Sequence, residues 1–103
     1  MAPEVIEFYG ARPQSDIWSL GCTVIELLRG EPPYFNHDPF SAMYKMVEDE
    51  HPPLPSGISQ ALYHFLMECF KKDVNFRVGA KELMKHAWLI GDKKVCESIY
   101  VYI

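Results

Sequence analysis

The chain has 103 residues, of which 49% are apolar and 14% aromatic, enough material for the core of one domain. This composition excludes an intrinsically disordered chain. The net charge of −4, from 10 basic and 14 acidic residues without long Lys/Arg runs, predicts no binding to nucleic acid or to an anionic membrane surface.

The first predicted element is an irregular segment over residues 1–14, where Pro3, Gly10 and Pro13 interrupt any helical pattern. A strong helix follows over 17–28, in which polar residues occupy only one narrow stripe. A helix that is apolar on nearly all sides is expected in the centre of a core. Gly30 is a favoured residue just after the end of such a helix.

A second helix is predicted to begin at Asp38-Pro39, because an Asp cap accepts orphan N–H groups and Pro has no N–H to leave unpaired. One face of this helix carries large apolar side chains, namely Phe40, Met43, Tyr44 and Val47. The helix should therefore be amphipathic and peripheral. It ends in an acidic run, 48–50, which is slightly unfavourable at the negative end of the helix dipole.

The proline-rich segment 51–55 predicts an extended connector rather than a polyproline ligand. Ser59 is expected to cap a third helix with a buried stripe of Leu62, Phe65, Leu66 and Cys69. A fourth helix, from near Gly79, is expected to turn inward Ala80, Leu83, Met84 and Trp88. Since only 99–103 has a strand-like pattern, the predicted fold is all-α, with about four helices over residues 1–90 and a divergent tail over 91–103.

The sequence motifs predict no catalytic, cofactor-binding or metal-binding residue in this chain. The glycines are too far apart to cradle a phosphate, and no serine lies in a nucleophile motif. The spacing of the four histidines, His37, His51, His64 and His86, fits no metal site.

The cysteines Cys22, Cys69 and Cys96 are widely separated and odd in number, which predicts reduced thiols in a cytoplasmic protein. The longest apolar stretch, 17–28, is too short to span a bilayer. Acidic residues also stand near the N-terminus, where an export signal needs positive charge. We therefore expect no membrane association.

Three motifs stand at the spacing of a known family: Met1-Ala2-Pro3-Glu4, the run Ser-Asp-Ile-Trp-Ser-Leu-Gly over 15–21, and Arg77. On these residues, the chain from 1 to about 90 resembles the helical C-terminal lobe of a Ser/Thr protein kinase, beginning at the end of the activation segment. The longer run over 15–36 looks most like the plant mitogen-activated protein kinase kinase kinase epsilon group. These are STE-type kinases, akin to fungal septation kinases.

The resemblance implies a set of residues with structural roles: Ala2, Pro3, Glu4, Asp16, Trp18, Gly21 and Arg77. In such kinases the glutamate of Ala-Pro-Glu pairs with an arginine placed like Arg77, and the pair holds the end of the activation segment on the lobe. The aspartate matching Asp16 bonds the catalytic loop there. We therefore expect Asp16 to be a buried acceptor that has no donor in this chain.

The resemblance also bears on activity, because the chain contains no Gly-rich loop, no Val-Ala-Ile-Lys strand, no His-Arg-Asp loop and no Asp-Phe-Gly. A partial kinase domain over 1–90, without the N-lobe and catalytic loop, is expected to be inactive by itself. ATP and Mg²⁺ would belong to an intact parent enzyme. The alternatives are a non-catalytic interaction module or a truncated gene product without a role.

In an intact parent, Phe40, Met43 and Tyr44 form a candidate docking surface for protein substrates or regulators; the other interpretation is simple packing against the lobe. The central helix, 17–28, would lack the neighbours that cover it in a complete kinase. Exposed apolar surface should follow, and with it a tendency of the isolated chain to self-associate.

Overall fold

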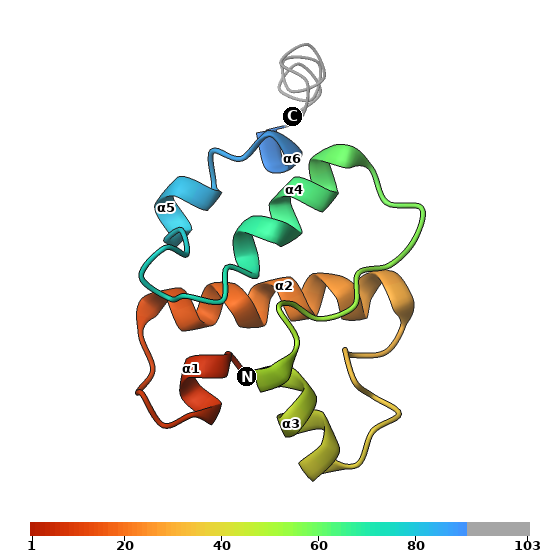
Figure 1. Cartoon of the computed structure of the whole chain (residues 1–103). Helices are drawn as coiled ribbons and strands as arrows, with labels where there is room; N and C mark the ends of the chain where they lie inside the picture. The colour runs from red at the N-terminus through yellow and green to blue at the C-terminus, as the bar shows by residue number, and fades with distance from the viewer. Residues whose placement is uncertain (91–103) are drawn as a thin grey trace.

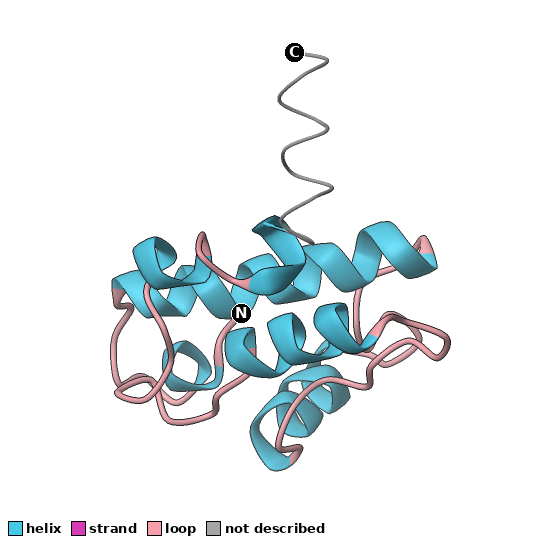
Figure 2. Cartoon of the chain, turned by 90° about the horizontal axis from the view of Figure 1, so that it is seen from above, coloured by secondary structure: helices cyan, strands magenta, loops and turns pink. Residues whose placement is uncertain are grey.

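The computed structural model describes residues 1–90, and every regular element in that part is a helix (Figures 1 and 2). The six helices are α1 (Pro3–Ile6), α2 (Pro13–Arg29), α3 (Pro39–Glu48), α4 (Gln60–Cys69), α5 (Ala80–Leu83) and α6 (Ala87–Ile90). The predicted all-α class is thus confirmed. The strand-like segment 99–103 lies outside the described residues.

Helix α2 crosses the middle of the molecule, with α4, α5 and α6 on one side of it and α1 and α3 on the other (Figure 1). The core lies mainly between α2 and α4, and its largest fully buried side chains are Trp18, Ile25, Phe65 and Leu66. Helix α1 packs against α3, and α6 packs against α4. The predicted central position of the 17–28 helix is therefore confirmed.

The opposite face of α2 is exposed, as the lack of covering neighbours predicted. Leu20 and Leu28 are half exposed or nearly so, and Leu27 is 80% exposed. In the sequence both faces of this helix are apolar, because these leucines recur along one face and Ile25 lies with Trp18 on a second face. The pattern alone therefore did not distinguish the covered face of the helix from the open one.

Helices begin earlier than the sequence predicted. The prediction of an irregular segment over 1–14 was wrong in part, because Pro3 starts α1 and Pro13 starts α2, one turn before the expected start. In both helices Pro occupies the first helical position, where its fixed φ suits the helix and its missing N–H costs no bond. At the other end, Gly30 adopts the left-handed conformation (φ 82°) that ends α2 as predicted.

The predictions for α3 and α4 are confirmed. The Asp38 carboxylate accepts from the N–H groups of Phe40 and Ser41, and the Ser59 hydroxyl accepts from the N–H of Leu62. The predicted apolar stripe of α4 is buried along its whole length. No residue of α3 is fully buried, in agreement with its predicted peripheral place.

The prediction of a single fourth helix was wrong, since the chain forms two short helices, α5 and α6, with a break at His86. The His86 ring nitrogen Nδ1 accepts the backbone N–H of Trp88 and so caps α6, while the backbone N–H of His86 donates to the Leu83 carbonyl. Leu83 is buried and Trp88 packs on Phe65, but Ala80 and Met84 are exposed, contrary to the prediction.

Candidate functional site

The main polar feature of the fold is a buried ion pair between Glu4, in α1, and Arg77, in the segment after α4. The Arg77 guanidinium donates from Nη1 to Glu4 Oε2 (2.9 Å) and from Nη2 to Glu4 Oε1 (3.0 Å). The Arg77 side chain is fully buried and that of Glu4 is 8% exposed. This two-point geometry fixes the direction as well as the distance of the carboxylate.

Arg77 uses all of its N–H donors, so it joins more than two elements. Nε donates to the Lys71 carbonyl (2.8 Å), Nη1 also to that of Gln14 (3.0 Å), and Nη2 also to that of Lys72 (3.3 Å). The guanidinium carbon lies 5.0 Å from the centre of the Trp18 ring in α2. Arg77 therefore ties α1 and the start of α2 to the segment that follows α4.

Ser15 is a member of this cluster that sequence reasoning missed. It is buried, and its hydroxyl donates to Glu4 Oε2 (2.6 Å) while accepting the N–H of Arg12 (3.0 Å). Its position in the first turn of α2 was the available signal, because a hydroxyl there often bonds the N–H of the cap residue. We call Glu4, Ser15, Trp18 and Arg77 the anchor cluster.

The electrostatics of the anchor cluster favour an ionised Glu4. Burial raises the pKa of the Glu4 carboxyl, but the hydrogen bonds from Arg77 and Ser15 outweigh it and hold that pKa below its ordinary value. Within residues 1–90, every buried side-chain N or O atom has a hydrogen-bond partner. The buried polar atoms of the anchor cluster are therefore all hydrogen-bonded, as expected for a structural role.

The remaining motif residues near the cluster serve packing. Ala2 is buried and Pro3 is the first residue of α1. Gly21 lies where α2 meets α4, and a Cβ added there would stand 2.8 Å from two Phe70 ring carbons and 2.9 Å from the Cys69 Cβ. Phe70 in turn packs edge-on against Trp18, with ring centres 5.0 Å apart. The absence of a side chain at Gly21 therefore allows the two helices to approach.

Asp16 differs from expectation. It is exposed on the first turn of α2, so the prediction of a buried acceptor without a donor was wrong for this structure. Its neighbours Ser15 and Ile17 are buried, whereas the Asp16 carboxylate remains in water. In this position its charge lies near the positive end of the helix dipole.

The candidate docking residues lie on the exposed surface of α3. Phe40 is 86% exposed, Met43 40% and Tyr44 65%. Packing against the described residues therefore leaves Phe40 and Tyr44 mostly uncovered and covers Met43 in part. We call them the α3 face.

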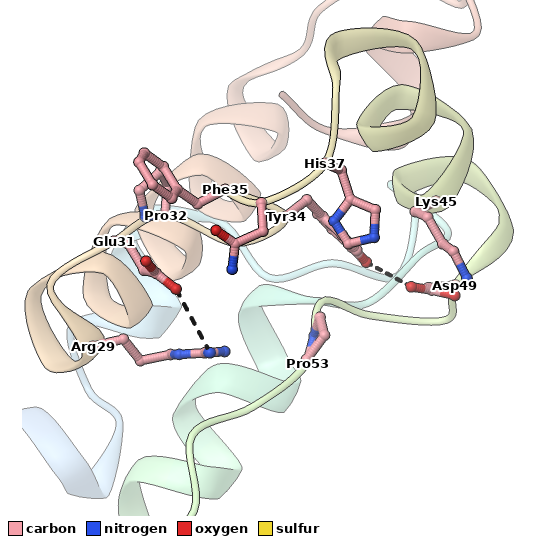
Figure 3. A pocket seen from close by; sticks show the side chains of 10 residues that line it. Arg29, Glu31, Pro32, Tyr34, Phe35, His37, Lys45, Asp49 and Pro53 are labelled. Carbon is pink, nitrogen blue, oxygen red and sulfur yellow. Dashed lines mark hydrogen bonds and ion pairs between the residues drawn. The ribbon is translucent and has the colours of Figure 1, made fainter.

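A cavity of about 300 Å³ opens between α3 and the loop after α2 (Figure 3). The Tyr34 hydroxyl donates to Asp49 (2.8 Å), and Arg29 lies 4.0 Å from Glu31 at the other end. Burial raises the pKa of the Tyr34 hydroxyl above its ordinary value, and the hydrogen bond to Asp49 raises it further. Charged side chains of both signs line the cavity, among them Arg29, Lys45 and Asp49.

The two cysteines of the described residues differ in exposure, since Cys69 is buried and Cys22 is half-buried. Cys22 and Cys69 are free thiols. Burial raises the pKa of both, that of Cys69 to about 12, which keeps the thiols protonated. Residues 1–90 hold no group of His, Cys, Asp and Glu side chains that fits a metal ion, and none of their helices is long and apolar enough to cross a membrane.

Comparison with known proteins extends these observations. The family described as protein kinase domain matches residues 1–89. Cell division control protein 7 of Schizosaccharomyces pombe is 63% identical over 87% of the chain, and cytokinesis protein sepH of Aspergillus terreus 58% identical over 91%. MAP3K epsilon protein kinase 1 of Arabidopsis thaliana is 47% identical over 95%. The chain spans only 7% or 8% of the length of these relatives.

Proposed function

Because this chain belongs to the protein kinase domain family, we propose that it forms part of the C-terminal lobe of a Ser/Thr kinase that acts in MAP3K-like signalling. The intact parent would be a cytoplasmic enzyme that uses ATP and Mg²⁺ to phosphorylate a protein. The groups that hold ATP and Mg²⁺ in kinases do not occur in these 103 residues. The role of this part is thus support rather than chemistry.

The observation that carries the proposal is the anchor cluster. Glu4 belongs to an Ala-Pro-Glu motif, and the cluster holds it on the helices by two charge-assisted bonds from Arg77 and one from Ser15. Phosphoryl transfer depends mainly on correct positions and charges, so the end of the activation segment needs a rigid support. A fully buried arginine with all of its donors used supplies that support.

A chimera tests this proposal. The matching segment of MAP3K epsilon protein kinase 1 would be replaced by residues 1–90, and phosphate transfer to a general protein substrate measured. We expect an active chimera, loss of activity with Glu4→Gln, and no loss with Lys81→Met, which alters only an exposed residue of α5. A folded but inactive chimera would argue against the proposal, and the isolated 103-residue chain should neither bind Mg·ATP nor transfer phosphate.

A second proposal concerns the α3 face, whose exposure supports docking of a protein substrate or regulator. In the chimera, Phe40→Ala combined with Tyr44→Ala should raise KM for a docking substrate and leave kcat unchanged. Met84→Ala is the matched control, because Met84 is an equally exposed apolar residue away from α3. Binding of the docking substrate by the isolated 103-residue chain would favour the alternative of a non-catalytic interaction module. If neither the chimera nor the isolated chain binds it, both the docking proposal and this alternative are wrong.

A further inference from the structure

The end of α3 carries charges that its own helix does not balance. The acidic run 48–50 stands at the negative end of the helix dipole, and Lys45 is the only basic residue in the last turn. Lys72, far away in the sequence, supplies the missing charge. Its Nζ donates to the Val47 carbonyl and to the Asp49 carbonyl, the latter at 3.0 Å. A cation from another segment thus caps the last turn of α3.

Lys72 is itself held by the anchor cluster. Its backbone carbonyl accepts from Arg77 Nη2 (3.3 Å), and the carbonyl of the preceding residue, Lys71, accepts from Arg77 Nε (2.8 Å). The same guanidinium is bound on its other edge by Glu4. Arg77 therefore fixes the backbone from which the half-buried Lys72 side chain reaches α3.

The contact extends beyond α3 into the cavity of Figure 3. The Asp49 carboxylate accepts the Tyr34 hydroxyl, and Tyr34 has a positive φ of 62°, a conformation that bulky residues rarely adopt. Such a conformation persists only where surrounding contacts hold it. The end of α3 that Lys72 caps is thus also the support for the loop after α2.

We propose that Lys72 is a positioning residue that couples the anchor cluster to α3, so that the hold on Glu4 and the placement of the α3 face depend on each other. The consequence for docking rests on the function proposed above. The coupling itself rests on the bonds of Lys72 and Arg77, which act beside the direct packing of α1 against α3. In a kinase, it would link the end of the activation segment to the surface on which protein partners dock.

Hydrogen exchange on the 103-residue chain tests the coupling through the amides of α3, with those of α4 as reference. Lys72→Met keeps the apolar stem but removes the donor, and should speed exchange in α3 about tenfold or more, as expected for a lost bond from a charged donor. Lys71→Met is the matched control, since that side chain is exposed and only its backbone is used. It should leave α3 unchanged.

Two further variants complete the test. Lys72→Arg retains a donor and should restore most of the exchange protection in α3. This comparison remains informative if Lys72→Met speeds exchange throughout the chain. Glu4→Gln should also speed hydrogen exchange in α3. The double variant Glu4→Gln with Lys72→Met should speed it by less than the product of the two single-variant factors. Equal exchange in Lys72→Met and Lys71→Met, no rescue by Arg, or independent effects of the Glu4 and Lys72 changes would overturn the proposal. The measurement needs no kinase activity, so an inactive chimera would leave its result standing.

Discussion

Replacing Glu4 by Gln is the most direct perturbation of the anchor cluster, because it preserves the shape of the side chain and removes its charge. The amide retains a single acceptor oxygen. If that oxygen takes the Oε2 position, it keeps the bonds from Ser15 and Arg77 Nη1, but the amide NH₂ then faces the Nη2 donor. One charge-assisted bond becomes a contact between two donors, and a fully buried guanidinium loses its counter-ion.

The magnitude follows from this geometry. A hydrogen bond to a charged group contributes about 1.5–3 kcal/mol, and leaving a buried ion unpaired raises the total loss to about 3–5 kcal/mol. Ser15→Ala removes only the hydroxyl bond and should cost about 1–2 kcal/mol. Arg77→Met should cost more than Glu4→Gln, because it also leaves the carbonyls of Gln14, Lys71 and Lys72 without that donor.

Urea unfolding followed by circular dichroism measures these differences at neutral pH. The pH dependence gives a second measure, since the pKa of Glu4 in the folded chain lies below the pKa of this carboxyl in the unfolded chain. The stabilisation from its charge is therefore fully present above that unfolded pKa, and it is lost as the pH falls through the lower folded pKa. The stability gap between the wild type and Glu4→Gln should close in acid along the same course.

A loss below about 1 kcal/mol at neutral pH would refute the reasoning, because that is the range of exposed ion pairs. A gap that stays constant from neutral pH into acid would also refute it, since the lost interaction would then not depend on the Glu4 charge. The double variant Glu4→Gln with Arg77→Met should lose less than the sum of the single variants.

Three other predictions concern packing and surface. Gly21→Ala should cost about 1–3 kcal/mol in urea unfolding, because its Cβ would stand 2.8 Å from Phe70; no loss would show that α4 can shift away. Ser59→Ala should cost about 1 kcal/mol through the lost α4 cap, and restoration by Ser59→Asp would distinguish capping from packing. Leu27→Glu should reduce the binding of a dye that recognises exposed apolar surface, without loss of helix content. Unchanged dye binding would show that the exposed face of α2 is not the surface that binds the dye.

The helix ends that the sequence predicted correctly depend on signals within a few residues. Asp38 and Ser59 cap the first turns of α3 and α4, and Gly30 ends α2 by its left-handed backbone. The break between α5 and α6 was missed because it depends on the His86 ring, whose capping bond the apolar pattern does not reveal. The burial of Ala80 and Met84 was wrong for the same reason, since it assumed one continuous helix.

For the candidate site, the sequence by itself determined the two partners that matter most, Glu4 and Arg77, because their residue types and spacing match a family. The tertiary structure alone decided that Ser15 joins them, that Asp16 remains in water and that Lys72 caps α3. These outcomes depend on which segments meet in space. A carboxylate, hydroxyl or ammonium group has the same local signature whether its partner is protein or water, so only the folded chain distinguishes the two.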